Sequence, residues 1–129
     1  MPFEIIVPPG SEALYSDLHF AQATSAGGLI LCSGQIGTDE NGKIPESAED
    51  EFRRAWQKVR SVVQAAGASM ADIVEISSFH VGLRANLGTF MKVKDEFVKE
   101  PYPAWTAVGV TELAVEGARV EIRVVASTQ

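Results

Sequence analysis

The most regular hydrophobic pattern in the chain lies at residues 47–66. Its apolar residues recur at steps of three and four, which is the spacing of a buried face on an amphipathic helix. They are Phe52, Trp56, Val59, Val63 and Ala66. Ser47 followed by Asp50 resembles a capping box, and Gly67 is a natural helix end. The pattern predicts a helix here, with its aromatic residues in the core and not in a ligand site.

A second helix is predicted over residues 87–99, before Pro101 and Pro103. Strand-like runs fill much of the remainder, with a glycine turn between the second and third. They cover residues 3–7, 19–25, 29–33, 73–83, 104–113 and 119–126. Residues 11–17 and 34–45 show neither the helical spacing nor the alternation of a strand, and they are expected to form loops.

Two of the predicted strands alternate. In the strand over residues 73–83, one side carries Val74, Ile76, Ser78 and His80. In the last strand, one side is apolar and the other is charged. The apolar side is Val120, Ile122 and Val124, and the charged side is Arg119, Glu121 and Arg123.

The order β-β-β-α-β-α-β-β predicts an α+β fold, a mixed β-sheet with two helices on one face. The 129 residues are enough for a single domain, over residues 1–129. The second face of the sheet would then lie bare. A bare apolar face on a small protein is commonly covered by symmetric self-association.

Composition narrows the class of protein. Hydrophobic residues make up 46% and charged residues 22%, and the net charge is −6. An acidic chain without a basic run argues against nucleic-acid binding, which depends on neutralising phosphates. The sequence contains neither a membrane-length apolar run nor a signal-peptide pattern, so the cytoplasm is the expected location.

Few residues suggest catalytic chemistry. There is no phosphate-binding loop, dinucleotide fingerprint or zinc-protease motif, so no cofactor is expected. His19 and His80 are far apart in sequence without an evident carboxylate partner, and no metal site is expected. Ser78 and His80 face the same side of a strand, but a nucleophilic serine would also need an orienting acid. Cys32, in an apolar run, is expected to be structural.

Glu121 is the one carboxylate that stands out, because it lies in the middle of a strand whose other face is apolar. On an outer face it would belong to an ordinary charged row. Under a partner subunit it would be partly desolvated, which raises a carboxyl pKa. The sequence leaves both interpretations open.

Several segments, in this order, resemble the RidA (YjgF, liver perchloric-acid-soluble protein) family over residues 14–126, and most of all its YjgH branch. They are Leu31-Cys32-Ser33-Gly34-Gln35-Ile36, Ala65-Ala66-Gly67-Ala68-Ser69, Ser78-Phe79-His80, Pro101-Tyr102-Pro103-Ala104-Trp105-Thr106-Ala107-Val108 and Val120-Glu121-Ile122. The resemblance implies a chorismate-mutase-like fold and a homotrimer with a barrel-like core. It also implies small-molecule clefts between subunits.

Deaminases of that family hydrolyse imines and enamines to 2-oxo acids and ammonia, and an arginine in a P-A-R-[ST] pattern binds the substrate carboxylate. Here that position is Trp105, and the position of a cleft tyrosine is Phe20. The cleft glutamate is kept as Glu121, the expected catalytic residue. The resemblance also implies substrate-binding roles for Ser33, Gln35 and Thr106.

Three functions follow from the resemblance. The first is an imine or enamine hydrolase of altered specificity, because an indole cannot neutralise a carboxylate. The second is a non-catalytic trimer that binds a metabolite in the same cleft. The third is the endoribonuclease activity attached to the family by name, against which the acidic charge argues.

Overall fold

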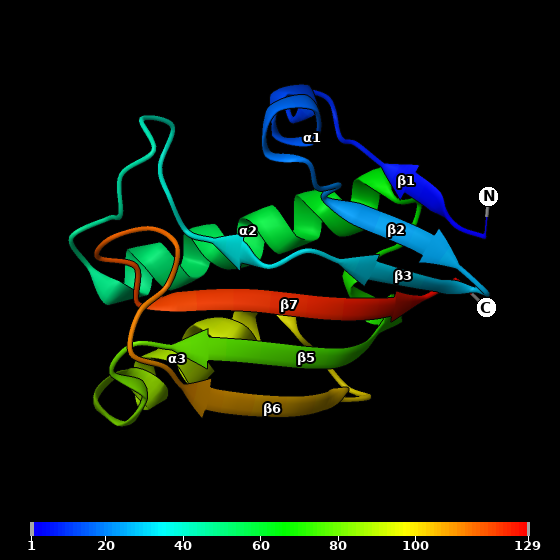
Figure 1. Cartoon of the computed structure of the whole chain (residues 1–129). Helices are drawn as coiled ribbons and strands as arrows, with labels where there is room; N and C mark the ends of the chain where they lie inside the picture. The colour runs from blue at the N-terminus through cyan, green and yellow to red at the C-terminus, as the bar shows by residue number, and fades with distance from the viewer. Residues whose placement is uncertain (1, 129) are drawn as a thin grey trace.

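The computed structural model describes residues 2–128, which form a mixed sheet and three α-helices (Figure 1). The helices are α1 (Glu12–Leu18), α2 (Ala48–Ala65) and α3 (Leu83–Phe97), with a short 3-10 turn at Met70–Asp72. The strands are β1 (Glu4–Ile6), β2 (Ala23–Ala26), β3 (Leu29–Cys32), β4 (Gln35–Ile36), β5 (Ile73–His80), β6 (Ala104–Gly109) and β7 (Val120–Ser127). The predicted α+β class is confirmed.

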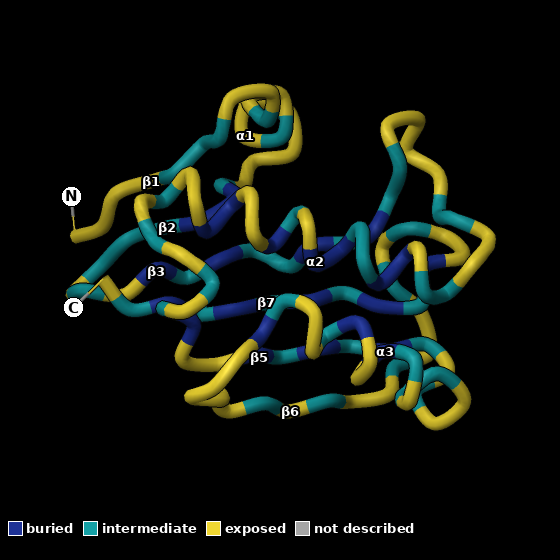
Figure 2. The backbone as a smooth tube through the Cα atoms, turned by 180° about the vertical axis from the view of Figure 1, so that it is seen from behind, coloured by how far each residue is buried: buried dark blue, intermediate teal, exposed yellow. Residues whose placement is uncertain are grey.

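The sheet runs in the order β1-β2-β3-β7-β5-β6, and β4 also pairs with β7. Only β5 and β6 are parallel, joined through α3, while β7 runs antiparallel to β3, β4 and β5. Helices α2 and α3 cover one face, so the most deeply buried residues follow β7 and the inner side of α2 (Figure 2). The strand β6 forms one edge of the sheet, and β1 forms the other.

Helix α2 follows its predicted pattern. The Ser47 hydroxyl accepts a hydrogen bond from the Asp50 backbone N–H at 3.2 Å, which caps the first turn. Phe52 and Trp56 are fully buried, and the Phe52 ring meets Phe90 of α3 edge-on at 5.5 Å. This aromatic contact joins the two helices over the sheet.

The last strand also follows its predicted alternation. Val120, Ile122 and Val124 are buried against the helices, whereas Glu121 and Arg123 face the other way. In β5 the side of Ile76, Ser78 and His80 is buried. Val74 does not share that side and is 45% exposed, because a register shift between Ile73 and Glu75 interrupts the alternation.

Four local predictions were wrong. Residues 11–17 are not a loop, because Glu12–Leu18 forms α1, a short helix without a buried residue that gave no apolar stripe to detect. It ends at His19, whose φ of 63° turns the chain, so β2 begins at Ala23 and Phe20 lies before the strand. The predicted loop over 34–45 contains the short strand β4, and α3 begins at Leu83, four residues earlier than expected.

One ion pair fixes the beginning of β7. Glu51, in the first turn of α2, is fully buried. It accepts hydrogen bonds from the backbone N–H and the guanidinium of Arg119, both at 2.7 Å. Because Arg119 also donates to the carbonyls of Pro45 and Glu46, the loop before β7 is tied to the start of α2. This anchor sets the register of the strand that carries Glu121.

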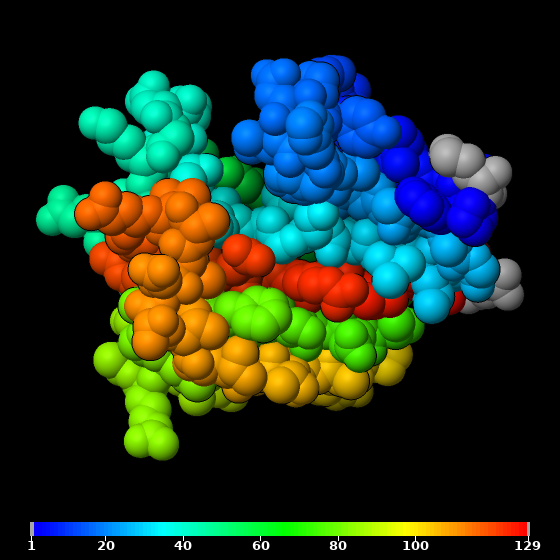
Figure 3. Space-filling model, in the orientation of Figure 1, coloured from blue at the N-terminus to red at the C-terminus, as the bar shows by residue number. Residues whose placement is uncertain are grey.

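The second face of the sheet carries no helix among residues 2–128, and Figure 3 looks onto it. Phe79 and Glu121 lie on this open face, opposite one another in the β5–β7 ladder. Val108 of β6 is 38% exposed and continues the same row. None of the described helices is long and apolar enough to cross a membrane.

Candidate functional site

The carboxylate of Glu121 lies directly against the backbone of Gly34. A Cβ atom added to Gly34 would stand 2.1 Å from Glu121 Oε2, which no real contact allows without movement. The approach depends on the pairing of β4 with β7, which sets Ile36 opposite Glu121. Glycine is therefore required at residue 34 for the Glu121 side chain to keep this position.

No hydrogen bond or ion pair engages the half-buried Glu121 carboxylate within residues 2–128. Its neighbour Arg123 points at Glu75 instead, at 4.0 Å. A carboxylate held in place but without an internal partner is available to accept a proton or a hydrogen bond from a bound molecule.

The segment that carries Phe20 is attached to the segment that carries Gly34. The Ser33 hydroxyl donates to the Ala21 carbonyl at 2.7 Å, and the Ser33 N–H donates to the Gln22 carbonyl at 2.8 Å. The Phe20 ring is 40% exposed. We call Phe20, Ser33, Gly34 and Glu121 the Glu121 group.

Gln35 faces the other side of the sheet from Glu121. It is opposite Ile122 in the ladder, and its Nε2 donates to Gln22 Oε1 at 2.6 Å and to the Ser33 carbonyl at 3.2 Å. Beyond the two glutamines is an open groove of about 280 Å³ beside Lys58 and Ser61 of α2. In this chain the side chains of Ser33 and Gln35 hydrogen-bond to Ala21 and Gln22, and so join the segment after Phe20 to the segment around Gly34.

Trp105 lies on the helix-covered face, packed against the core. Its indole N–H donates to Ser78 Oγ at 2.9 Å, and Ser78 Oγ lies 2.8 Å from His80 Nε2. The indole N–H can only donate, so Ser78 Oγ accepts this hydrogen bond, and the Ser78 hydroxyl can donate its own hydrogen bond to His80 Nε2. The indole N–H is therefore already engaged within the chain.

Ser78 and His80 do form a hydrogen-bonded pair, but not a catalytic one. Ser78 is fully buried and His80 is 1% exposed. His80 Nδ1 has no hydrogen-bond partner among the described residues, so no acid orients the ring. Burial lowers the pKa of His80 below its ordinary value of 6.5, which keeps the imidazole neutral. A serine nucleophile has no access to substrate here.

The outer side of Trp105 meets helix α3. Lys94 Nζ lies 4.7 Å from the centroid of the indole, and the Phe90 ring lies 5.9 Å from it. Thr106, the next residue of β6, faces the opposite way and is exposed on the open face. We call Trp105, Thr106 and Lys94 the edge group.

The Glu121 group and the edge group do not meet within one chain. Glu121 is on β7 and Trp105 on β6, with β5 between them, and the two side chains leave opposite faces of the sheet. Two strand spacings alone amount to roughly 10 Å. Glu121 and Trp105 of one chain therefore do not face a common cleft.

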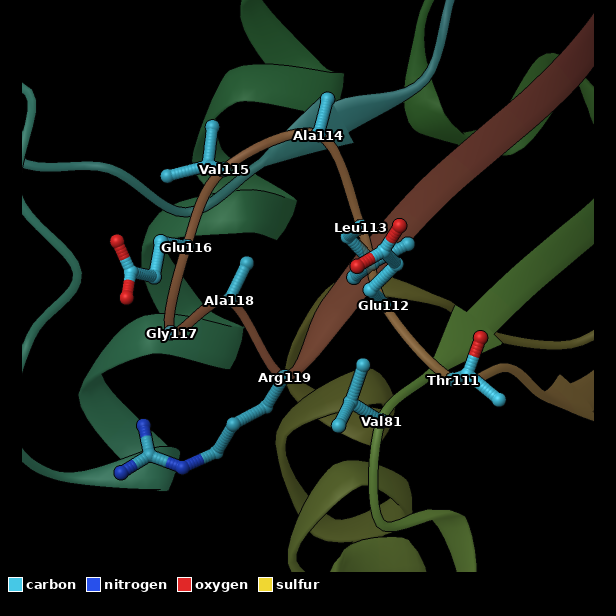
Figure 4. Close-up of a pocket in the computed structure, with 10 residues that line it drawn as sticks. All are labelled: Val81, Thr111, Glu112, Leu113, Ala114, Val115, Glu116, Gly117, Ala118 and Arg119. Atoms are coloured by element: carbon cyan, nitrogen blue, oxygen red, sulfur yellow. The ribbon is translucent and has the colours of Figure 1, made fainter.

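A larger hollow of about 620 Å³ lies elsewhere, under the loop from Thr111 to Ala118 (Figure 4). Its one cation is Arg119, whose side chain leaves the hollow toward the start of α2, where Glu51 engages it. The hollow contains no nucleophile–base pair and no group of metal ligands is found within residues 2–128. We do not place the chemistry there.

Cys32 is an unreactive part of the core. It is 4% exposed, and burial raises the pKa of its thiol to about 11. The structural role expected for it is confirmed.

With these features in view, comparison with known proteins identifies the class of protein. The chain belongs to the family described as Endoribonuclease L-PSP, whose model matches residues 10–128. This is the RidA/YjgF family that the sequence motifs indicate.

Particular relatives agree. The chain is 37% identical over 122 residues to the RutC family protein YjgH of Escherichia coli, covering 94% of this chain and 92% of that protein. It is also 37% identical over 108 residues to the 2-iminobutanoate/2-iminopropanoate deaminase of Dermatophagoides farinae, covering 80% of each.

Solved structures share the fold. That of protein YjgH has a TM-score of 0.88 at 34% identity and covers 98% of this chain and 97% of its own. That of Escherichia coli TdcF with bound serine has a TM-score of 0.78 at 29% identity and covers 85% of this chain and 88% of its own.

Proposed function

We propose that this protein hydrolyses imines or enamines in the cytoplasm, at clefts formed between the subunits of a homotrimer, with Glu121 as the catalytic residue. The observation that carries the proposal is the unpaired Glu121 carboxylate held against Gly34. Relatives named deaminases of 2-iminobutanoate and of reactive intermediates supply the reaction class.

The reaction needs little more than a positioned base. The oxygen of water forms a bond to the iminium carbon, and the water passes one proton to the Glu121 carboxylate. That proton moves to the nitrogen, and the carbon–nitrogen bond breaks with its electron pair on nitrogen. As the carbonyl forms, the hydroxyl gives its remaining proton to the Glu121 carboxylate and ammonia leaves. Glu121 passes this second proton to the ammonia, which becomes ammonium, and the carboxylate is restored. One carboxylate can thus carry both protons of the water to the nitrogen in turn.

The separation of the two groups within one chain supports a site shared between copies. The Glu121 group belongs to the middle of the sheet and the edge group to its free edge. When the edge of one copy lies over the open face of the next, both groups come to one cleft. The exposed Val108 and the half-buried Phe79 on that face are suited to such contact.

The edge group makes the specificity different from that of a deaminase with an arginine at residue 105. Trp105 supplies an apolar ring whose N–H is engaged by Ser78, and Phe20 lacks a hydroxyl. The cleft is then more apolar, and we expect it to prefer an imine with a bulky or aromatic side chain. Small imino acids lose the bidentate arginine contact.

An oxidase-coupled assay tests the proposal. An amino-acid oxidase generates imines from phenylalanine and from 2-aminobutanoate, and the appearance of the 2-oxo acid is compared with the uncatalysed rate. We expect acceleration with the phenylalanine imine and little with 2-iminobutanoate. A protein that binds phenylpyruvate but accelerates neither imine is a metabolite-binding trimer, the alternative function. Sedimentation analysis should find three copies per particle, and a monomer would overturn the shared cleft.

An endoribonuclease is the weakest alternative. The net charge is −6, and Arg119, which lines the large hollow, is already paired with Glu51. Cleavage of RNA would need cations along a groove to hold phosphates.

A further inference from the structure

We propose that Lys94 is a substrate-binding residue, and that its ammonium group binds the carboxylate of the substrate beside the indole of Trp105. The inference rests on the proposed function and deepens it, because it names the substrate class as imino acids with an apolar side chain.

The first observation is the position of the charge. Lys94 Nζ stands 4.7 Å from the centroid of the Trp105 ring, at the outer edge of the sheet. The side chain reaches this position from α3, one layer above β6. Trp105 occupies the position of the arginine in the P-A-R-[ST] pattern. Lys94 of α3 therefore places a positive charge next to residue 105, although that residue itself is no longer a cation.

The second observation is that Lys94 has no carboxylate partner within residues 2–128. Its neighbours on the helix layer do have partners. Lys92 contacts Glu49 at 3.2 Å, and Arg53 contacts Glu96 at 2.6 Å. Lys94 is half-buried, whereas Lys92 is exposed, yet only the exposed lysine is paired.

A ring face alone does not satisfy the ammonium of Lys94. The indole attracts the cation with its negative π-face, but it accepts none of the three N–H hydrogens in the way an oxygen does. A carboxylate placed beyond the ring would accept those hydrogens and balance the charge. The apolar remainder of such a molecule would lie along the indole.

An ammonium also differs from a guanidinium in what it selects. Arginine fixes both carboxylate oxygens in one plane, whereas lysine is a point charge on a flexible stem. Lys94 therefore binds a carboxylate with less demand on its orientation. A bulky substrate that could not lie flat against an arginine could still place its carboxylate here.

The test is a calorimetric titration with phenylpyruvate, and with phenylpyruvamide as its uncharged counterpart. Phenylpyruvate stands for the imino acid, with oxygen in place of nitrogen. We expect Lys94→Ala to weaken phenylpyruvate binding about tenfold or more, and Lys94→Arg to retain most of it. Lys92→Ala is the matched control and should match the wild type, because Lys92 is already paired with Glu49.

The outcomes separate this inference from the proposed function. Equal affinity of the wild type and Lys94→Ala, or equal affinity of the wild type for the acid and the amide, overturns the role of Lys94. So does a wild type that binds no phenylpyruvate. Lys94-dependent binding without turnover of any imine supports the role of Lys94 and contradicts only the hydrolase.

Discussion

The Glu121 carboxylate occupies the space that any side chain at Gly34 would need, with Oε2 only 2.1 Å from the nearest Cβ position. The two residues are 87 positions apart in sequence (121 − 34) and meet because β4 pairs with β7. Gly34 thus sets where the proposed catalytic carboxylate stands, and a change at Gly34 acts on Glu121.

Gly34→Ala should therefore reduce turnover more than stability. The atoms in the way belong to the flexible end of Glu121, so the carboxylate can move aside, at no more than about 1 kcal/mol of folding free energy. The displaced carboxylate should lower kcat about 100-fold. Gly88→Ala, in the exposed part of α3 with open space around it, is the control. It should leave turnover unchanged and stabilise the helix by about 0.5–1 kcal/mol. A Gly34→Ala variant with normal turnover would contradict the role assigned to this contact.

Ser78→Ala should destabilise the fold by about 1–3 kcal/mol, because it leaves His80 Nε2 and the Trp105 N–H without their partner. Urea unfolding measures the change. Ser61→Ala, at an exposed position of α2 whose hydroxyl bonds only its own helix, should change the unfolding free energy by less than about 0.5 kcal/mol. Equal effects for the two serines would mean that the buried hydrogen bonds contribute nothing net.

The protein should become less stable as the pH is lowered, because His80 takes up a proton when the chain unfolds. Burial lowers the pKa of His80 in the folded protein below the ordinary 6.5, so the unfolded chain binds more protons in this window. The contribution is complete above pH 6.5 and is lost as the pH falls from 6.5 toward the folded pKa. The slope is at most about 1.4 kcal/mol per pH unit.

Urea unfolding at a series of pH values measures this slope, with His80→Gln as the comparison. The variant should be less stable throughout but should lack the slope just below pH 6.5. Within residues 2–128 no ion pair engages the ring, whose hydrogen bond is with Ser78 and whose ring contact is with Phe90. An unchanged slope in His80→Gln would assign the pH dependence to other groups.

Trp105→Arg should gain affinity for small 2-oxo acids by about tenfold or more, because a guanidinium offers the bidentate contact that the indole lacks. Titration with 2-oxobutanoate measures the gain. The same variant should hydrolyse 2-iminobutanoate faster than the wild type. If affinity does not rise, the side chain at residue 105 does not reach the ligand.

Patterns with a local period were predictable from the sequence. Helix α2 and the alternation of β7 follow from repeated apolar residues, and both are as expected. Helix α1 was not predictable, since it buries nothing. The burial of Glu51 could not be foreseen because it depends on Arg119, 68 residues away.

The candidate site was predictable in its members but not in its geometry. Glu121, Trp105 and Phe20 follow from the resemblance. That Glu121 lies against Gly34, and that Trp105 faces the helices and meets Lys94, follows only from strand pairing. The only sign of Lys94 in the sequence is its place on the helix that precedes the edge strand. Lys92 lies on the same helix, so this sign does not distinguish the two lysines.

The central claim is that the Glu121 carboxylate transfers the protons of imine hydrolysis. The most direct measurement is the turnover of the phenylalanine-derived imine by the wild type and by Glu121→Gln, which keeps the shape of the side chain and removes its basicity. The account predicts that kcat falls about 100-fold or more while the affinity for phenylpyruvate changes little. Equal turnover by the two proteins would contradict it.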